Sequence, residues 1–293
     1  MAMGSTGPHP ALISLLEKLM NGSTESRTAS TEQPLGRVSE PGRMPAHWLL
    51  AQMGKRVLRP GGMELTRRML DALAIGPADD VVEFAPGLGA TAKLTLQRGP
   101  ASYVAIERDE AAAKHVGGLL RGPRQRCVIG NAQATGLPPQ SASVVYGEAM
   151  LTMQPSATKN QIAAEAARLL RPSGRYGIHE LALVPDDLPD SLRQEIARAF
   201  GRTIHHLVLP LTAAEWRDIL ERHGLEVQTT LHAPMHLLEP GRLVRDEGPL
   251  RAARFVFNVL CHKEARKRVL ELRNLFCSYR DNVAAVALVG VKK

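Results

Sequence analysis

The chain has 293 residues, of which 44% are hydrophobic and 23% are charged, values typical of a soluble globular protein. Aromatic residues make up only 4% of it, which argues against the stacked binding of single-stranded nucleic acid. The formal net charge of +8 suggests anionic partners. Six units of that surplus fall in residues 234–293, where 12 Lys and Arg stand against 6 Asp and Glu.

The sequence shows neither a secretion signal nor a run of about 18 apolar residues, so we expect a cytoplasmic protein that does not span a membrane. Its three cysteines, Cys127, Cys261 and Cys277, are far apart and follow no metal-ligand spacing. They are predicted to stay reduced, and no metal site is expected.

A short apolar cluster over 11–20 predicts a helix, which a flexible arm rich in Ser, Thr, Gly and Pro follows up to residue 45. Pro45 suits the first position of a further helix, and another helix is expected over 63–74. Residues 59–62, Arg-Pro-Gly-Gly, interrupt these two helices. They form either a plain helix-helix turn or a loop that closes over a site.

From residue 80 onward, short apolar runs alternate with helical patterns. The predicted strands cover 80–84, 102–107, 126–129, 143–147 and 175–180. The predicted helices between them cover 90–98, 109–120 and 157–170. Such alternation implies right-handed βαβ crossovers and a mostly parallel sheet.

The last third of the chain is predicted to begin with a helix near 189–200. Thr212 is expected to start the next helix, with Glu215 completing a capping box and Gly224 as the stop. Strands follow near 225–231 and 282–293. The basic, apolar segment 250–276 lies between these strands and predicts one long helix or two shorter ones.

One stretch, VVEFAPGLGATA at 81–92, predicts a strand that runs into a glycine-rich turn. Taken alone, Gly87 and Gly89 fit either an ordinary tight turn or a nucleotide site. Glu83 stands before the turn, and Glu107 ends the next predicted strand one βαβ step later. Both carboxylates therefore fall at the carboxyl edge of the sheet, where ligands of open α/β sheets bind.

The order of these segments resembles the class I S-adenosylmethionine-dependent methyltransferases over about 150 residues. The matching stretches are EFAPGLG at 83–89, VAIE at 104–107, GNA at 130–132 followed by LP at 137–138, the strand and exit at 143–151, and EAARLLRPSGR at 165–175. Ala85 replaces the first glycine of the family's turn, and Ser143 stands where the family often has Asp.

The resemblance implies a Rossmann-like, doubly wound sheet of seven mostly parallel strands, the last one antiparallel, with helices on both faces. We expect an N-terminal helix and arm at 1–45 and one methyltransferase domain at 46–293. The predicted parts of that domain are a helical cap at 46–75, a cofactor-binding core at 80–184, substrate-side helices and a strand at 185–233, a basic helical insertion at 234–283, and the last strand at 284–293.

The cofactor implied by the resemblance is S-adenosylmethionine, with S-adenosylhomocysteine as the product. Charge favours it over NAD or FAD, because a carboxylate at Glu83 repels phosphates and attracts a sulfonium and an ammonium. Glu83 could instead complement a helix dipole, and Glu107 could be a solvated acid. The predicted cofactor-binding residues are Glu83, Phe84, Ala85, Pro86, Gly87, Gly89, Glu107, Arg108, Asn131, Ala132 and Glu148.

Methyl transfer needs a general base only when the nucleophile arrives protonated. The candidates are Glu148, His179 and Glu180, where the fourth and fifth strands end. Glu148 could instead contact the methionine part of the cofactor, and His179 could be a hydrogen-bonded strand-end histidine. His205 and His206 are further pocket candidates, although adjacent histidines at a helix end are more often surface residues.

The predicted function is methyl transfer to an oxygen, nitrogen or carbon of a small molecule. A lipid or nucleic-acid methyltransferase that uses the basic segment 250–276 is the first alternative, with peripheral membrane contact or a homodimer as roles for that segment. Nucleic acid is disfavoured, because GEAM at 147–150 replaces an Asn/Asp-Pro-Pro-aromatic tetrad. A non-catalytic relative is the second alternative, which Ala85 and Ser143 keep open.

Overall fold

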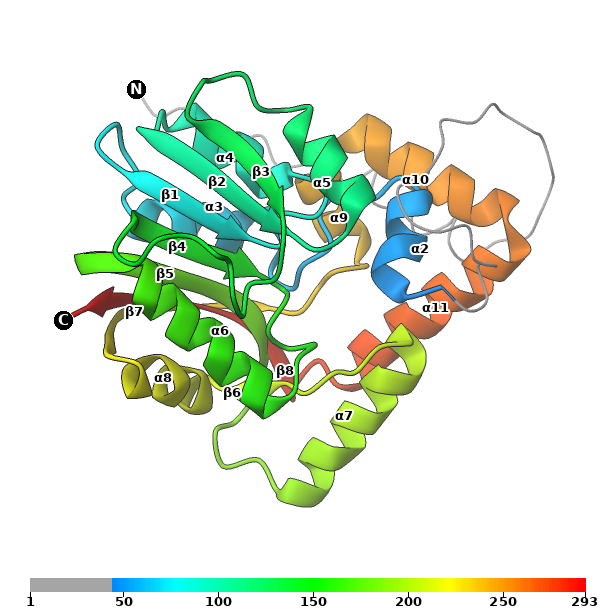
Figure 1. The fold of residues 1–293 in the computed structure, drawn as a ribbon. Helices are drawn as coiled ribbons and strands as arrows, with labels where there is room; N and C mark the ends of the chain where they lie inside the picture. The colour runs from blue at the N-terminus through cyan, green and yellow to red at the C-terminus, as the bar shows by residue number, and fades with distance from the viewer. Residues whose placement is uncertain (1–43) are drawn as a thin grey trace, which may run out of the picture.

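A computed structural model describes residues 44–293, and the helix predicted over 11–20 lies outside them. The helices are α2 (Ala46–Gln52), α3 (Gly62–Ala72), α4 (Ala90–Gln97), α5 (Glu110–Gly117), α6 (Ser156–Leu169), α7 (Asp190–Ile204), α8 (Ala213–Arg222), α9 (Pro240–Glu247), α10 (Pro249–Cys261) and α11 (Lys263–Ser278) (Figure 1). The strands are β1 (Asp80–Phe84), β2 (Ser102–Glu107), β3 (Gln125–Ile129), β4 (Ala142–Glu148), β5 (Leu170–Leu183), β6 (Leu211–Thr212), β7 (Leu225–Pro234) and β8 (Val283–Lys292).

The strands form one sheet in the order β3-β2-β1-β4-β5-β8-β7, and the two-residue β6 pairs with β5 beside this path. All pairs are parallel except those of β8, which runs antiparallel to β5 and β7. The predicted doubly wound sheet with an antiparallel last strand is confirmed. Phe84 pairs with Ile106 and with Gly147, so the carboxyl ends of β1, β2 and β4 meet at one edge.

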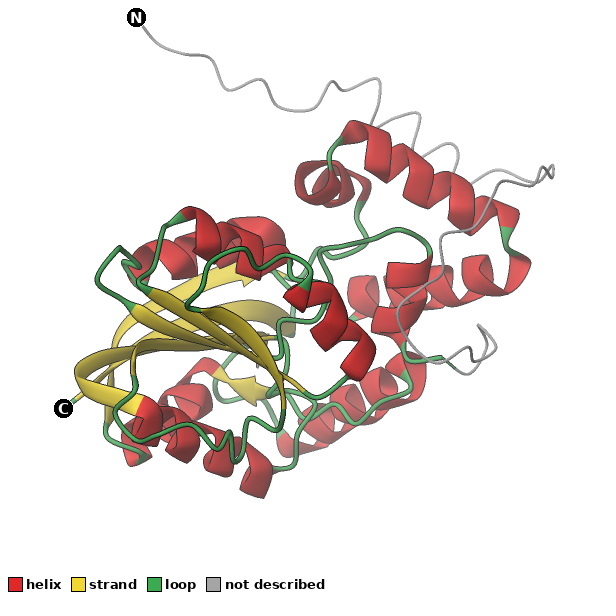
Figure 2. Ribbon diagram, turned by 45° about the horizontal axis from the view of Figure 1, so that its top comes forward, coloured by secondary structure: helices red, strands yellow, loops and turns green. Residues whose placement is uncertain are grey.

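Helices cover both faces of the sheet (Figure 2). One face packs against α3, α4 and α5, and the other against α6 and α8. Side chains alternate along each strand, so Val82 and Phe84 face α6 and α8 whereas Val81 faces α3. The same alternation puts Glu83 on the α3 face, next to Tyr146 of β4.

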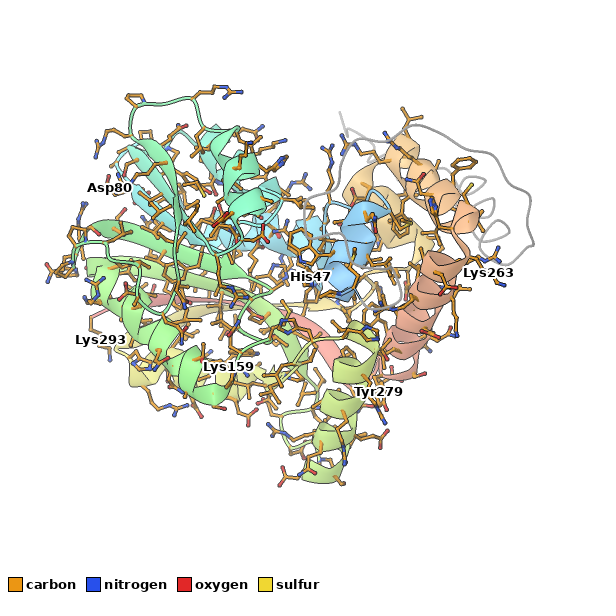
Figure 3. All side chains as sticks on the ribbon, turned by 45° about the vertical axis from the view of Figure 1, so that its right-hand side comes forward. His47, Asp80, Lys159, Lys263, Tyr279 and Lys293 are labelled. Atoms are coloured by element: carbon orange, nitrogen blue, oxygen red, sulfur yellow. The ribbon has the colours of Figure 1, made fainter. Side chains whose placement is uncertain are left out.

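A second apolar core lies beyond the carboxyl ends of the parallel strands, among α2, α7, α9, α10 and α11 (Figure 1). The rings of Phe200 from α7 and Phe276 from α11 meet there at 5.8 Å. Leu181 and Leu183 at the end of β5 join the same core and tie it to the sheet. His47 of α2 lies on the side of this group that is nearer to the sheet (Figure 3).

Most predicted elements appear within a few residues of their expected ends. The capping box at Thr212 is present, with Glu215 N–H to Thr212 Oγ at 3.2 Å and Thr212 N–H to Glu215 Oε2 at 2.8 Å. The basic segment forms two helices, which break at His262 where the backbone is extended. Helix α9 was not predicted, although Pro240 at its first turn is a helix-start signal.

Candidate functional site

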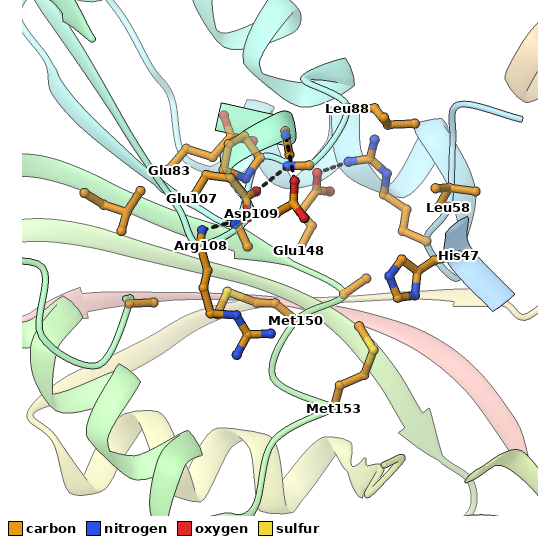
Figure 4. A pocket seen from close by; sticks show the side chains of 18 of the residues that line it. His47, Leu58, Glu83, Leu88, Glu107, Arg108, Asp109, Glu148, Met150 and Met153 are labelled. Atoms are coloured by element: carbon orange, nitrogen blue, oxygen red, sulfur yellow. Dashed lines mark hydrogen bonds and ion pairs between the residues drawn. The ribbon is translucent and has the colours of Figure 1, made fainter. Parts of the chain in front are cut away.

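A cavity of about 450 Å³ opens at the carboxyl edge of the sheet (Figure 4). Two groups of residues form its wall. The first, which we call the cofactor half, follows β1, β2, β3 and β4 and comprises Glu83, Ala85–Leu88, Ala90, Thr91, Ile106–Asp109, Gly130–Gln133, Glu148 and Ala149. The second, the acceptor half, comes from α2, the loop after it, the segment after β4, α6 and the segment after α7. Its residues are His47, Trp48, Arg56, Leu58, Arg59, Met150, Met153, Gln154, Thr158, Ile162 and His206, and Ala112 of α5 completes the wall on the cofactor side.

The turn after β1 is left-handed at three positions: Ala85, Gly87 and Gly89, with φ of 51°, 55° and 68°. A Cβ placed on Gly87 would meet no atom within 4 Å, so its open side faces free space at the cavity wall. A Cβ on Gly89 would come within 2.5 Å of the side chain of Leu119. Gly87 therefore lets a ligand approach the backbone. Gly89, which precedes α4, leaves room for the side chain of Leu119.

Glu83 is buried between two phenols at the cofactor half. Tyr103 and Tyr146 both donate hydrogen bonds to its Oε2, the latter at 2.6 Å. Burial raises the pKa of Glu83 to about 7, although these two hydrogen bonds act in the opposite direction. The carboxylate that the charge argument relied on is therefore only partly ionised at neutral pH.

Glu107 holds the ends of β1 and β2 together. Its Oε2 accepts the N–H of Gly87 at 3.0 Å, and its Oε1 accepts those of Arg108 at 2.8 Å and Asp109 at 3.0 Å. A carboxylate has about four acceptor positions, so this one keeps capacity for a ligand hydroxyl. Its side chain lines the cavity in a fixed orientation.

Glu148 is the centre of a buried polar cluster at the cavity wall. Arg59, which arrives on the loop between α2 and α3, forms an ion pair with it. Thr66 and Thr91 donate their hydroxyls to it, Thr66 at 2.6 Å. Burial alone would raise the pKa of Glu148, but the charge of Arg59 and the hydrogen bond from His179 outweigh burial and lower it to about 2. Glu148 is thus a permanent negative charge of the site and a weak base.

His179 is fully buried and lies outside the cavity wall. Its Nδ1 is 2.8 Å from Glu148 Oε1, and its Nε2 is 2.6 Å from the carbonyl oxygen of Pro60. The ring is therefore held between two oxygen atoms, one on each side. The arrangement supports the alternative interpretation of His179, a hydrogen-bonded histidine at a strand end.

The remaining predicted site residues divide between the cavity and the core. The cavity is lined by Pro86, Arg108, Asn131 and Ala132. Phe84 lies in the core, and Gly89 lies at the start of α4, outside the cavity wall. Asn131 and Gln133 hold each other through an amide hydrogen bond of 2.9 Å. Arg59 lines the cavity too, so loop 59–62 reaches the site rather than serving as a turn alone.

The acceptor half contains residues for which the sequence offered little signal. His47 and Trp48 belong to α2, whose sequence carries no motif. Of the two pocket candidates His205 and His206, His206 lines the cavity and His205 does not. Burial, and then the neighbouring charge of His206, lower the pKa of His47 to about 4. His47 is therefore neutral at physiological pH.

Within residues 44–293, no set of three His, Cys, Asp or Glu side chains is placed to hold a metal ion. The same residues include no helix with both the length and the apolar run needed to cross a bilayer. The three cysteines are free thiols.

Comparison with known proteins finds a family model described as a methyltransferase domain, which matches residues 82–178. An uncharacterized protein of Haemophilus influenzae is 30% identical over 234 residues, 78% of this chain and 91% of that protein. Solved structures share the fold at low identity. A phosphoethanolamine N-methyltransferase of Haemonchus contortus in complex with S-adenosyl-L-methionine has a TM-score of 0.63 and 14% identity, over 84% of this chain and 55% of that one.

A geranyl diphosphate methyltransferase in complex with S-adenosylmethionine has a TM-score of 0.59 and 14% identity, over 78% of this chain and 85% of that one. The match at 82–178 spans β1 to β5, the strands whose carboxyl ends build the cofactor half. Glu83, Gly87 and Glu107 stand there in the order of the family's motifs. Residues 82–178 form a methyltransferase domain, and the chain shares its fold with solved S-adenosylmethionine-dependent methyltransferases.

Proposed function

We propose that the protein transfers a methyl group to an oxygen, nitrogen or carbon of a small-molecule acceptor. The observation that carries this proposal is the continuous cavity, whose cofactor half opens directly into an acceptor half walled by α2 and the segment after β4. A wall of this kind suits an acceptor that is enclosed together with the cofactor, because methyl transfer requires alignment and the exclusion of water.

The cofactor half fits S-adenosylmethionine in charge and in space. Arg59 and Glu148 present opposite charges at the wall, which matches the carboxylate and ammonium of the methionine end. We assign Arg59, with the N-terminal end of α4 beside it, to the carboxylate and Glu148 to the ammonium. Glu107 is assigned to the ribose hydroxyls.

Asn131 and Ala132, at the end of β3, are assigned to the adenine. The free space beside Gly87 would receive the part of the cofactor that crosses the turn. When bound, the cofactor supplies a methyl group made electrophilic by the sulfonium. The chain's own residues position it, keep water away and hold the acceptor in line with it.

Calorimetry with S-adenosylmethionine and with S-adenosylhomocysteine tests the first half of the proposal. We expect both to bind in the micromolar range or tighter. A folded protein that binds neither would contradict the proposal. A screen with methyl-labelled cofactor over alcohols, phenols, amines and carbon acids then tests the acceptor, with label recovered in a small molecule as the expected result.

A lipid acceptor is a second candidate because of the surface of α10. Leu250 is 87% exposed and Phe257 51% exposed, on a helix that also carries Arg251 and Arg254 and no acid. Such a surface suits an anionic bilayer. Sedimentation with vesicles of anionic and of neutral lipids checks this candidate, and equal lack of binding to both would remove it.

A further inference from the structure

We propose that Asp246 and Glu247, in the last turn of α9, hold the loop at 54–61 in the position that lets Arg59 bind the carboxylate of the cofactor. We call these two acids the α9 clamp. They are positioning residues, because they act through Arg59. The inference rests on the proposed function, since it deepens the assignment of Arg59 to that carboxylate.

The loop between α2 and α3 makes two contacts with the buried polar cluster of the site. Arg59 forms the ion pair with Glu148, and the carbonyl oxygen of Pro60 lies 2.6 Å from Nε2 of His179. Leu58 of the same loop lines the cavity (Figure 4). The loop itself contains no helix or strand. Its course therefore depends on contacts with other parts of the chain.

Glu247, the last residue of α9, holds the start of this loop. Its Oε1 accepts the backbone N–H groups of Arg56 at 2.8 Å and of Val57 at 2.9 Å. The same oxygen lies 3.6 Å from Nζ of Lys55, whose side chain is fully buried. The side chain of Glu247 is itself only 2% exposed. One shielded carboxylate therefore fixes the three consecutive residues 55–57.

Asp246, the residue before it, holds the end of the loop. Its Oδ1 accepts the N–H of Met63 at 2.9 Å, across 183 positions of the sequence. A Cβ placed on Gly62 would lie 2.5 Å from both carboxylate oxygens, so the carboxylate lies directly against the backbone. Helix α3 starts after Gly61, which has no side chain to cap it, and Asp246 supplies a capping acid instead.

The α9 clamp thus fixes the chain on both sides of Arg59. A guanidinium stays charged wherever it points, so the clamp controls its position and not its charge. A hydrogen bond to a carboxylate weakens steeply once its distance and angle leave the favourable range. Adenine and ribose are assigned to residues at the ends of β2 and β3, which their own strands hold. Loss of the clamp should therefore weaken only the contact with the carboxylate.

Two ligands that differ at the methionine end test this role. S-adenosylhomocysteine carries the carboxylate, whereas 5′-methylthioadenosine keeps the adenine, the ribose and the sulfur but has neither carboxylate nor ammonium. We expect Asp246→Ala to bind S-adenosylhomocysteine at least tenfold more weakly than the wild type does. Its affinity for 5′-methylthioadenosine should stay within twofold, which also shows that the variant is folded. Calorimetry with the full chain measures both affinities.

Three further variants separate positioning from stability. Asp246→Asn keeps an oxygen for the N–H of Met63, so its affinity for S-adenosylhomocysteine should stay within twofold of the wild type. Lys55→Met/Glu247→Ala frees the other end of the loop without leaving one buried charge alone, and it should repeat the selective loss. Asp218→Ala removes an exposed acid of α8 and should match the wild type for both ligands.

A double-mutant cycle tests whether the clamp acts through Arg59. The variant Arg59→Met/Glu148→Met lacks the charges that the clamp places. Adding Asp246→Ala to it should change the affinity for S-adenosylhomocysteine by less than twofold. A loss as large as the one that Asp246→Ala causes in the wild type would overturn the proposal.

The outcomes keep the two proposals apart. A wild-type protein that does not bind S-adenosylhomocysteine contradicts the proposed function itself. If the wild type binds it and the clamp variants lose both ligands equally, or lose neither, the clamp does not position Arg59. If Asp246→Ala does not fold, Lys55→Met/Glu247→Ala decides by the same two affinities. Failure of both to fold would mean that these acids serve the fold alone, and it would overturn the inference.

Discussion

The two halves of the cavity are built in different ways. The residues of the cofactor half lie at the carboxyl ends of four strands, in the turns after them or in the first turn of α4, so local βα units place them. The acceptor half combines α2, the loop at 54–61 and the segment after α7, which meet in the second apolar core, with the segment after β4, whose Met150 packs in the core beside α6. Local sequence patterns therefore predict the residues of the cofactor half but not those of the acceptor half.

Arg59 of the acceptor half forms an ion pair with Glu148 of the cofactor half. Breaking this pair should have the largest effect on both halves of the cavity. Glu148→Ala leaves Arg59 buried without its partner. We expect the free energy of unfolding to fall by about 3–5 kcal/mol, the usual cost of breaking a buried pair on one side. Affinity for S-adenosylmethionine should fall by more than tenfold. Urea unfolding and calorimetry measure these two effects.

Arg98→Met is the matched control, because Arg98 pairs with the largely exposed Asp71. Its effect on stability should stay below about 1 kcal/mol. The double variant Arg59→Met/Glu148→Met removes both charges, so it should recover most of the lost stability but not the affinity. If that variant bound S-adenosylmethionine as tightly as the wild type, the ion pair would stabilise the fold without contributing to cofactor binding.

Variants of Glu83, the acid before the glycine-rich turn of the cofactor half, test whether this side chain acts as a charge or as a buried hydrogen-bonding group. Its pKa is raised from 4.5 to about 7, so the unfolded chain releases this proton first as the pH rises. Stability from this group is therefore full below about pH 4.5 and lost by about pH 7. A rise of this size corresponds to roughly 3 kcal/mol of stability.

Glu83→Gln removes the titrating group and keeps its size. Between pH 4.5 and 8 the wild type should lose up to about 3 kcal/mol of unfolding free energy relative to Glu83→Gln. The variant is therefore favoured at high pH. Urea unfolding at several pH values measures it. A difference that does not vary with pH would show that Glu83 is ionised throughout.

The sequence predicted the sheet and the cofactor half because period-two alternation and turn residues act over short distances. It predicted Glu107, whose role follows from its place at the end of β2. The sequence could not reveal that Tyr103 and Tyr146 surround Glu83, because those contacts cross from strand to strand. Nor could it place His47, since the packing of α2 depends on apolar residues more than 100 positions away.

Glu107 tests the part of the cofactor half that the sequence did predict. Glu107→Ala removes the acceptor assigned to the ribose hydroxyls, so affinity for S-adenosylmethionine should fall by about 1.5–3 kcal/mol. Glu107 also accepts three backbone N–H groups, so some stability is lost as well. Glu110→Ala, on the exposed side of α5, is the control. Equal affinity in the two variants would remove Glu107 from the site.

Ala85 is the position where the cofactor half departs from its family, and it should give the smallest effect. A residue with a Cβ in the left-handed region costs about 1–2 kcal/mol, and Ala85 has a φ of 51°. Ala85→Gly relieves this strain. It also raises the conformational entropy of the unfolded chain, which lowers the free energy of unfolding by about 0.4–1 kcal/mol. The net gain in unfolding free energy should therefore lie between about 0 and 1.6 kcal/mol, measured as a higher urea midpoint.

Ala74→Gly is the matched control, because Ala74 is also left-handed, with a φ of 46°, but lies outside the cavity wall. Both variants should gain stability by a similar amount. Only Ala85→Gly should also alter affinity for S-adenosylmethionine, since Ala85 lines the cofactor half. A loss of stability in Ala85→Gly alone would mean that the methyl group of Ala85 packs favourably in this turn, and that the departure from glycine stabilises the fold.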